Sequence, residues 1–490
     1  MKLTKSLLLA SAAGLAAVAT ASAADLPSKK AAPVEYVKVC PAFGPGFFYI
    51  PGSDTCLKVG GTAWFEGMYL QPYTKAQDQL GYRTNLTVSL DARTNTEYGL
   101  LRTVVAPQIA KRNGLEQSGS QEREGNATTN SNAVSTAKQT FFNANAYIQF
   151  GGLTVGRLGS FFGNQFSFND VVGNVGVDAR DPVQTAGYTL TLGNGITLTG
   201  AIEDSTDASR DGVYGLNNGA AALVATTAPA ANGQTVYLAT KGGVNYGGNR
   251  IPDAVLSLKV DQAWGSANLA AMSHAINYGN SSNTVVTTTA GVPSGIATAN
   301  YGNQFSNEYG YAVQGGVKVK LPMIAEGDAL VLNGIYASGF NQAVFRNMIG
   351  DRNSNDSGGW TGYNPGYNAT ATLADVVADQ TTGKTYQAKS WGTAGEFTHY
   401  ITPTFAAFIG GSYANLSWDA AARQTAAINP AHLYNAYIGA IWSPVKDFKI
   451  IPEVFYNKIT AKNAFVFSGA EPAAKSLDAW QARIQVRRDF

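Results

Sequence analysis

The chain has 490 residues, of which 14% are charged, against about 25% in ordinary soluble domains. Glycine is abundant and the mean hydropathy is near zero. This composition excludes a helical membrane protein, because each helical span needs about 20 mostly apolar residues. Low charge without high hydrophobicity fits strands that alternate between two environments, and it also fits a secreted, soluble β protein rich in glycine and asparagine.

The first 23 residues have the pattern of a secretory signal peptide. Lys2 and Lys5 form the positive start, residues 7–18 are mostly apolar, and an A-x-A cleavage site ends at Ala23. A membrane helix is disfavoured, because the apolar stretch is short and no stop-transfer charges follow it. Removal of residues 1–23 takes away two lysines and no acids, which leaves equal numbers of bases and acids. A near-zero net charge gives no support for nucleic-acid binding.

Residues 24–56 form a polar leader that contains both cysteines, Cys40 and Cys56. Export would place them in an oxidising periplasm, where the natural interpretation is one disulfide that closes a short loop. A zinc site is disfavoured, since two thiols without a second Cys or His pair cannot form a closed zinc shell.

From residue 57 to residue 490 the dominant pattern has period two, which is typical of strands with two unlike faces. The clearest segment is 82–93, where even positions are mostly apolar and odd positions are polar. Residues 188–202 repeat the pattern on both sides of Asn194-Gly195, a favoured type I′ turn pair. Residues 309–321 show it again.

Tight connections alternate with long polar ones along this region, and a compact soluble domain rarely needs so many long loops. A transmembrane barrel has this asymmetry, with short periplasmic turns and long extracellular loops. The long connections cover roughly 110–139, 159–184, 204–251, 277–307, 340–388, 416–432 and 460–477. Sixteen predicted strands lie between the connections, at residues 57–70, 82–93, 97–109, 140–150, 153–158, 185–193, 195–203, 252–262, 266–276, 308–320, 329–339, 389–400, 404–415, 433–442, 448–459 and 478–490.

These strands predict an all-β fold, a 16-stranded antiparallel transmembrane β-barrel that spans residues 57–490. In lipid every backbone amide must be paired internally, and only helices or closed barrels achieve this. Sixteen strands leave an aqueous lumen, whereas about eight would fill the interior with side chains. The polar faces would line that lumen, because packing them into a dry core would carry a large desolvation cost.

The last predicted strand is amphipathic, with Trp480 and Ile484 on the same face as the terminal Phe490. Such an ending resembles the assembly signal of outer-membrane barrels, which implies recognition by the β-barrel assembly machinery. Arg488 departs from that signal, because it occupies a lipid-facing position where a hydrophobic residue is usual. Near the interface an arginine there costs only about 0–1 kcal/mol.

Two stretches of the leader carry a family resemblance: residues 37–40 (VKVC) and 46–61 (GFFYIPGSDTCLKVGG). They are similar to the N-terminal motif of the alphaproteobacterial general porins. The resemblance implies a homotrimer in the outer membrane, among lipids and lipopolysaccharide, with passive diffusion of small hydrophilic solutes and ions. It also implies a third extracellular loop that folds inward and narrows the pore.

The connection at 159–184 fits that third loop by its order along the chain. It is aromatic at one end and carries Asp170, Asp178 and Asp181 toward the other. We expect these carboxylates to form the acidic side of a constriction, although they would equally serve as turn and cap residues in an ordinary solvated loop. The opposing basic wall is expected from Arg83, Arg93, Arg102, Arg157, Arg483 and Arg487. A transverse field between the two sides would orient dipolar solutes.

The sequence offers little support for an enzyme. Its three histidines, His274, His399 and His432, are widely spaced, and no catalytic or metal-binding motif is intact. We therefore expect no cofactor and no metal. Two alternatives to a general porin remain open: a channel specific for a sugar or another nutrient, and a secreted adhesive β protein without a pore. The first predicts an aromatic ladder along the bore, and the second predicts solubility or internal repeats.

Overall fold

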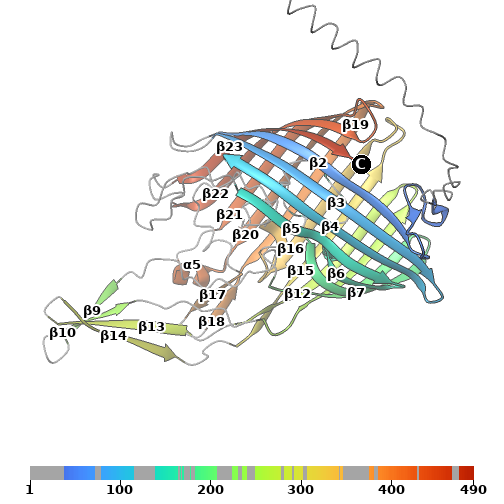
Figure 1. Ribbon diagram of the computed structural model, residues 1–490. Coiled ribbons are helices and arrows are strands. Elements are labelled where there is room, and N and C mark those ends of the chain that lie inside the picture. The colour runs from blue at the N-terminus through green and yellow to red at the C-terminus, as the bar shows by residue number, and fades with distance from the viewer. Residues whose placement is uncertain are drawn as a thin grey trace, which may run out of the picture.

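Sixteen antiparallel strands pair edge to edge into a closed ring in the computed structural model (Figure 1). The structure describes residues 38–71, 79–114, 138–163, 166, 168, 169, 177, 182–206, 223–229, 234–239, 249–277, 281–289, 292–301, 306–341, 343–345, 375–379, 384–426, 430–465 and 474–490. The ring closes because β2 pairs with β3 on one side and with β23 on the other. The predicted all-β fold and its sixteen strands are confirmed.

The ring strands follow chain order, each paired with the next. They are β2 (Cys56–Leu70), β3 (Leu80–Thr96), β4 (Gly99–Gly114), β5 (Lys138–Phe150), β6 (Leu153–Gly159), β7 (Pro182–Gly193), β8 (Ile196–Glu203), β11 (Asp253–Gln262), β12 (Gly265–Ile276), β15 (Glu308–Lys320), β16 (Ala329–Ser338), β19 (Lys389–Thr402), β20 (Phe405–Ser417), β21 (Ala431–Trp442), β22 (Phe448–Phe465) and β23 (Ala474–Asp489). Every predicted strand overlaps an observed one. The largest differences are extensions, for example of β22 to Phe465 where the expected end was residue 459.

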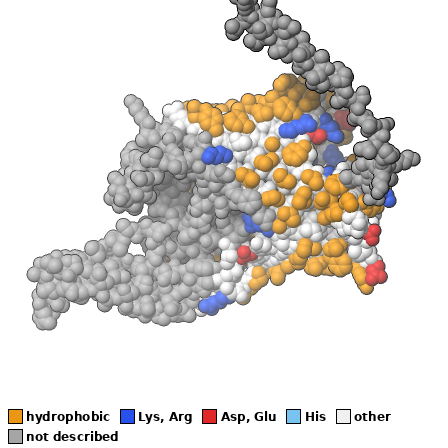
Figure 2. All heavy atoms as spheres, viewed as in Figure 1, with side chains coloured by type: hydrophobic (Ala, Val, Ile, Leu, Met, Phe, Trp, Pro, Cys, Tyr) orange, Lys and Arg blue, Asp and Glu red, His pale blue; other side chains and the backbone are white. Residues whose placement is uncertain are grey.

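Alternation along each strand separates an outer face from an inner one. On β3 the side chains of Tyr82, Leu86 and Leu90 are 47%, 40% and 39% exposed, whereas Arg83 and Asn85 are 5% and 1% exposed. The exposed set is therefore outward and apolar, and the polar set faces the lumen. Figure 2 shows hydrophobic side chains spread over the outer wall of the barrel. This wall suits lipid, where a charge at the midplane costs about 2–4 kcal/mol.

The tight turns gather at one end of the barrel, which we assign to the periplasm because short turns face it in outer-membrane barrels. The turn between β7 and β8 has the expected type I′ geometry, since Asn194 and Gly195 have φ values of 48° and 72°. A Cβ atom at Gly195 would lie 2.0 Å from the carbonyl oxygen of Asp261, so the neighbouring strand also requires glycine there.

The long connections contain structure that the sequence did not indicate. β9 (Leu223–Pro229), β10 (Gln234–Ala239), β13 (Ser281–Thr289) and β14 (Val292–Tyr301) form a four-stranded sheet from two connections that we expected to be loops. It lies beyond the long-loop end of the barrel (Figure 1). Smaller elements are β17 (Val376–Asp379), paired with β18 (Lys384–Gln387), and helix α5 (Ala420–Ala426). No helix of the described residues is long and apolar enough to cross a membrane.

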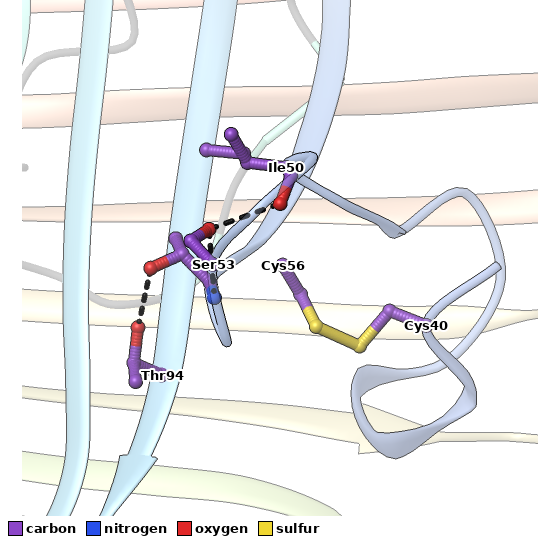
Figure 3. Close-up of a disulfide and its surroundings, with 6 residues drawn as sticks. Cys40, Ile50, Ser53, Cys56 and Thr94 are labelled. Atoms are coloured by element: carbon purple, nitrogen blue, oxygen red, sulfur yellow. Dashed lines mark hydrogen bonds between the residues drawn. A yellow bond between two sulfur atoms is a disulfide. The ribbon is translucent and has the colours of Figure 1, made fainter. Parts of the chain in front are cut away.

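The leader loop, residues 40–56, folds against the periplasmic end of the ring and is closed by a disulfide between Cys40 and Cys56, as predicted (Figure 3). It contains a 3₁₀ turn, η1 (Pro41–Phe43), and β1 (Phe48–Tyr49), which pairs with the start of β2. The hydroxyl groups of Thr55 and Thr94 lie 3.0 Å apart and join the loop to β3. The predicted signal peptide lies outside the described residues.

Contacts on the outer and the inner face of the barrel hold the seam between β2 and β23 together. At its periplasmic end the backbones of Gly61 and Phe490 exchange two hydrogen bonds, at 2.9 and 3.0 Å. A Cβ atom at Gly61 would lie 2.3 Å from the carbonyl oxygen of Thr87, so only glycine fits. Arg488 is exposed and has outward parity, and it donates from Nη1 to the Lys446 carbonyl oxygen in the adjacent periplasmic turn at 2.8 Å.

On the lumen side of the seam, Glu66 of β2 accepts hydrogen bonds from two residues of β23. Arg483 Nη1 lies 3.2 Å and Gln485 Nε2 lies 2.7 Å from Glu66 Oε1. The side chains of Glu66 and Arg483 are 2% and 1% exposed, so this is a buried ion pair. It links the first and last strands of the ring across sequence positions more than 400 residues apart.

Glu66→Ala should lower the free energy of unfolding by about 3 kcal/mol, because it removes a buried carboxylate that pairs with the buried Arg483. Urea unfolding of the barrel in detergent micelles measures this change. The matched control is Glu97→Ala, which removes an exposed carboxylate in the turn before β4. Equal stability of the two variants would show that the ion pair does not stabilise the seam.

Candidate functional site

The lumen is the candidate site, and its shape depends on the segment that follows β6. That segment is anchored first to β8: Ser160 Oγ and the Phe161 backbone N–H both donate to the Glu203 carboxylate, each at 2.8 Å. Glu203 is 1% exposed and faces the lumen. The chain therefore turns into the barrel directly after β6.

The same segment reaches the opposite wall. The backbone N–H and Nδ2 of Asn169 donate to the Glu396 carboxylate of β19 at 2.9 and 2.8 Å. Thr398 Oγ1 also accepts from Asn169 Nδ2 at 2.6 Å, and Tyr437 of β21 donates to Glu396 at 2.9 Å. β19 is seven strands from β6 around a ring of sixteen, so this segment crosses the bore. The inward fold of the third loop is confirmed.

Aromatic side chains attach the crossing segment to the inner wall of the barrel. Phe162, Phe166 and Phe168 are at most 7% exposed and belong to a buried cluster with inward residues of β11, β12 and β16, among them Met272 and Ile335. Val177, farther along, accepts a hydrogen bond from Asn333 of β16 through its carbonyl oxygen. The same cluster contains Phe408 of β20 and Phe455 of β22, so the aromatic side chains of the loop belong to one apolar cluster inside the barrel.

The predicted acidic residues of the loop, Asp170, Asp178 and Asp181, lie outside the described residues. Their role in a constriction stays a prediction. Asn169, beside the first of them, lies inside the barrel through its contact with Glu396.

The predicted basic residues separate into three groups, and the first is buried at the seam. Arg483 pairs with Glu66, and Arg83, the cross-strand partner of Glu66, places its guanidinium 4.5 Å from the Trp64 ring centroid. Arg83 and Arg483 are 5% and 4% exposed. Their charged groups are therefore buried in the wall and are not exposed to the water of the lumen.

The second group lies near the periplasmic end and is accessible to water. Asp91 accepts from Arg93 at 2.7 Å and from Arg102 at 2.9 Å, and Arg487 pairs with Asp489 at 2.7 Å. The side chains of Arg93, Arg102 and Arg487 are 24%, 26% and 40% exposed. Alternation places these three arginines on the inner face, and their role as a basic pore wall stays a prediction.

Arg157 is the third case, and here the structure contradicts the expected position. Arg157 is in register with Ala146 of β5 and Gln184 of β7, on the same side of β6 as Leu153, which is outward and 41% exposed. The alternation therefore places Arg157 on the outer face. A strand of seven residues contains few apolar positions to reveal its register, and the charge alone was misleading.

Two features of the lumen were missed by sequence reasoning. Glu203 and Glu396 anchor the crossing loop. The only signal for them in the sequence is their position on the inward-facing side of the alternating strand pattern. The inner wall of β20–β22 carries an aromatic cluster beside buried polar side chains such as Asn435 and Asn457. Phe408, Tyr437 and Phe455 pack ring to ring there and are 1%, 3% and 0% exposed. These aromatic rings are covered, so they do not form a ladder open to solutes.

The histidines lie apart and serve separate contacts. His274 Nδ1 is 2.9 Å from Asp253 in a buried pair, His399 Nδ1 is 2.7 Å from Asp328 beside a periplasmic turn, and His432 bonds Tyr413 at 2.8 Å. Among the described residues, no group of three or more His, Cys, Asp or Glu side chains is arranged to hold a metal ion.

A closed ring with an apolar outer wall, a charged inner wall and a loop across the bore defines a transmembrane β-barrel of the outer-membrane type. The chain belongs to the porin subfamily, whose family model matches residues 25–482. Membership of this family, together with the barrel fold, supports a location in the outer membrane.

Curated relatives include Porin Omp2b of Brucella canis and of Brucella melitensis, each 34% identical over 221 residues. The alignment covers 43% of this chain and 56% of each relative, so the chain spans little more than half the length of the curated relatives it matches. Among solved structures, the outer membrane channel DcaP of Acinetobacter baumannii is similar, with a TM-score of 0.52 and 14% identity, covering 90% of this chain and 99% of that one. This likeness concerns the fold alone.

The Asn169–Glu396 contact should control the position of the crossing loop. Glu396→Ala removes a carboxylate that accepts hydrogen bonds from Asn169 and Tyr437, and hydrogen bonds to a charged group contribute about 1.5–3 kcal/mol. We expect a loss of stability in that range together with noisier single-channel current. A double-mutant cycle with Asn169→Ala tests the contact, since residues that interact show a coupling energy. Additive effects of the two substitutions would exclude the contact, and Asp419→Ala, at an exposed site, is the control.

Proposed function

We propose that the chain forms a water-filled outer-membrane channel for passive diffusion of small hydrophilic solutes and ions. The observation that supports this most directly is the ring of sixteen strands with water-accessible charged side chains on its inner wall. Water beside these side chains keeps them hydrated, because even a paired charge loses hydration energy when it is buried. Residues 1–23 would direct export and be cleaved, and the working unit would be a homotrimer, as in the family that the leader resembles.

A nutrient-specific channel is the second candidate. It would need aromatic or polar side chains in a graded series that solutes can touch. The aromatic rings that face inward on β20–β22 are covered, so they offer solutes no such path. A secreted adhesive protein is disfavoured by the apolar outer wall, which would be exposed to water in a soluble molecule.

The first experiment is single-channel recording of the detergent-purified mature protein in a planar bilayer. We expect stable steps of nanosiemens order that rise roughly in proportion to bulk salt, because ions would cross through water. Small steps that a particular sugar blocks at low concentration would favour the specific channel instead. Absence of conductance from protein shown to be folded and inserted would overturn the proposal.

The constriction is tested by Asp170→Asn, Asp178→Asn and Asp181→Asn together. If these carboxylates face the bore, their removal should shift the reversal potential in a salt gradient toward anion preference. Asp204→Asn/Asp419→Asn/Asp447→Asn is the control, since it removes three carboxylates outside that loop. An unchanged reversal potential would remove the three aspartates from the constriction.

A further inference from the structure

Five neighbouring strands each place one base on the inner wall near the periplasmic end: Lys449 on β22, Arg487 on β23, Lys58 on β2, Arg93 on β3 and Arg102 on β4. Each lies within about four residues of the strand end that joins a short turn. Each is also an even number of residues away from buried, inward-facing residues of the same strand, so it points to the lumen. We call these five residues the basic arc.

Like charges lie directly opposite each other in the basic arc. Lys449 and Arg487 are cross-strand partners, and so are Arg93 and Arg102. Such pairs are destabilising. Only two inward carboxylates of these strand ends compensate, Asp91 between Arg93 and Arg102, and Asp489 beside Arg487. Five bases therefore face two acids, which leaves a net positive charge that stability alone does not explain.

The basic arc is accessible to water, unlike the charges at the seam. Lys58 and Lys449 are exposed, and Arg487 keeps 40% of its side chain exposed, whereas Arg483, farther into the barrel, keeps 1%. Lys318 and Lys320 of β15 add inward bases at the same end of another part of the wall. Asp261 of β11 lies beside these two lysines and pairs with Lys259 at 3.0 Å, so that part of the wall is compensated. The acids Glu97, Glu326 and Asp447 at this end lie in the turns.

The leader loop supports the basic arc directly. The ring of Phe47, 4% exposed, lies with its centroid 4.7 Å from the Arg93 guanidinium carbon and 5.9 Å from Lys58 Nζ. The negative face of an aromatic ring attracts cations, which helps two bases to lie close together. Cys56 is the cross-strand partner of Arg93, so the disulfide holds this ring at the basic arc.

We propose that the basic arc is an anion-collecting site at the periplasmic mouth, which favours solutes carrying two or more carboxylate or phosphate groups. Guanidinium groups bind such oxygens in bidentate fashion, and a positive wall raises the local anion concentration. The site is distinct from the constriction at the crossing loop. The inference rests on the proposed channel function.

The test compares the wild-type channel with Lys58→Gln/Lys449→Gln/Arg487→Gln in a planar bilayer. Under a salt gradient the variant should lose anion preference, seen as a shift of the reversal potential toward cations. Inorganic pyrophosphate added on the periplasmic side should reduce the wild-type chloride current, and the variant should need about tenfold more for the same reduction. The control is Lys111→Gln/Lys384→Gln/Lys389→Gln, which removes three exposed lysines outside the basic arc.

Each outcome has a definite meaning. Wild-type protein that is folded but never conducts contradicts the channel function itself. Channels that conduct, with equal reversal potential and pyrophosphate sensitivity in the wild type and the arc variant, overturn the anion-collecting site, and so does an equal change in the control. If the triple variant does not fold, Asp489→Asn serves in its place: it removes one of the two acids and should increase anion preference.

Discussion

Closure of the strand ring is the constraint on which the rest of the structure depends. A strand in hydrocarbon has no water to satisfy its backbone, so every N–H and C=O must find a partner on a neighbouring strand. The chain meets this requirement only when β2 pairs with β23, and that seam is reinforced on the outside by Phe490 with Gly61 and on the inside by Glu66 with Arg483. Once the ring is closed, alternation assigns each side chain either to lipid or to the lumen.

The same constraint explains why most of the ring was predictable. Lipid on one side and water on the other force a period of two, and the segment 82–93 shows that period with mostly apolar even positions and polar odd positions. Asn194-Gly195 marks a tight turn because few residue pairs adopt positive φ at both positions. The four-stranded sheet of β9, β10, β13 and β14 lies outside the ring, so its strands do not separate lipid from water. The sequence there therefore need not alternate, and it did not distinguish strands from loops.

The site was less predictable because its contacts join residues that are remote in sequence. The loop was expected to fold inward. The residue that accepts its hydrogen bonds, Glu396, is however 227 residues away from Asn169 in the sequence, and no local pattern connects the two. Polarity also proved an incomplete guide to the lumen. The inner faces of β20–β22 carry a covered aromatic cluster farther into the barrel, whereas β22, β23, β2, β3 and β4 each carry a base near the periplasm. A loop that crosses a wide bore needs an apolar surface to pack on, and the water-filled space is then left to the charged side.

The leader disulfide is explained better by its position beside the charged side of the lumen than by a general contribution to stability. In the chain-entropy model a loop of about 15 residues gives about 3 kcal/mol. The ring, however, closes through β2 and β23 and does not pass through the leader. What the disulfide fixes locally is Phe47, between Arg93 and Lys58. Electrostatic repulsion would otherwise push the side chains of these bases apart. The Phe47 ring, held in place by the Cys40–Cys56 disulfide, attracts both cations and leaves their charge in place. The leader therefore maintains a positive wall at the periplasmic end, where the arginine side chains remain accessible to water.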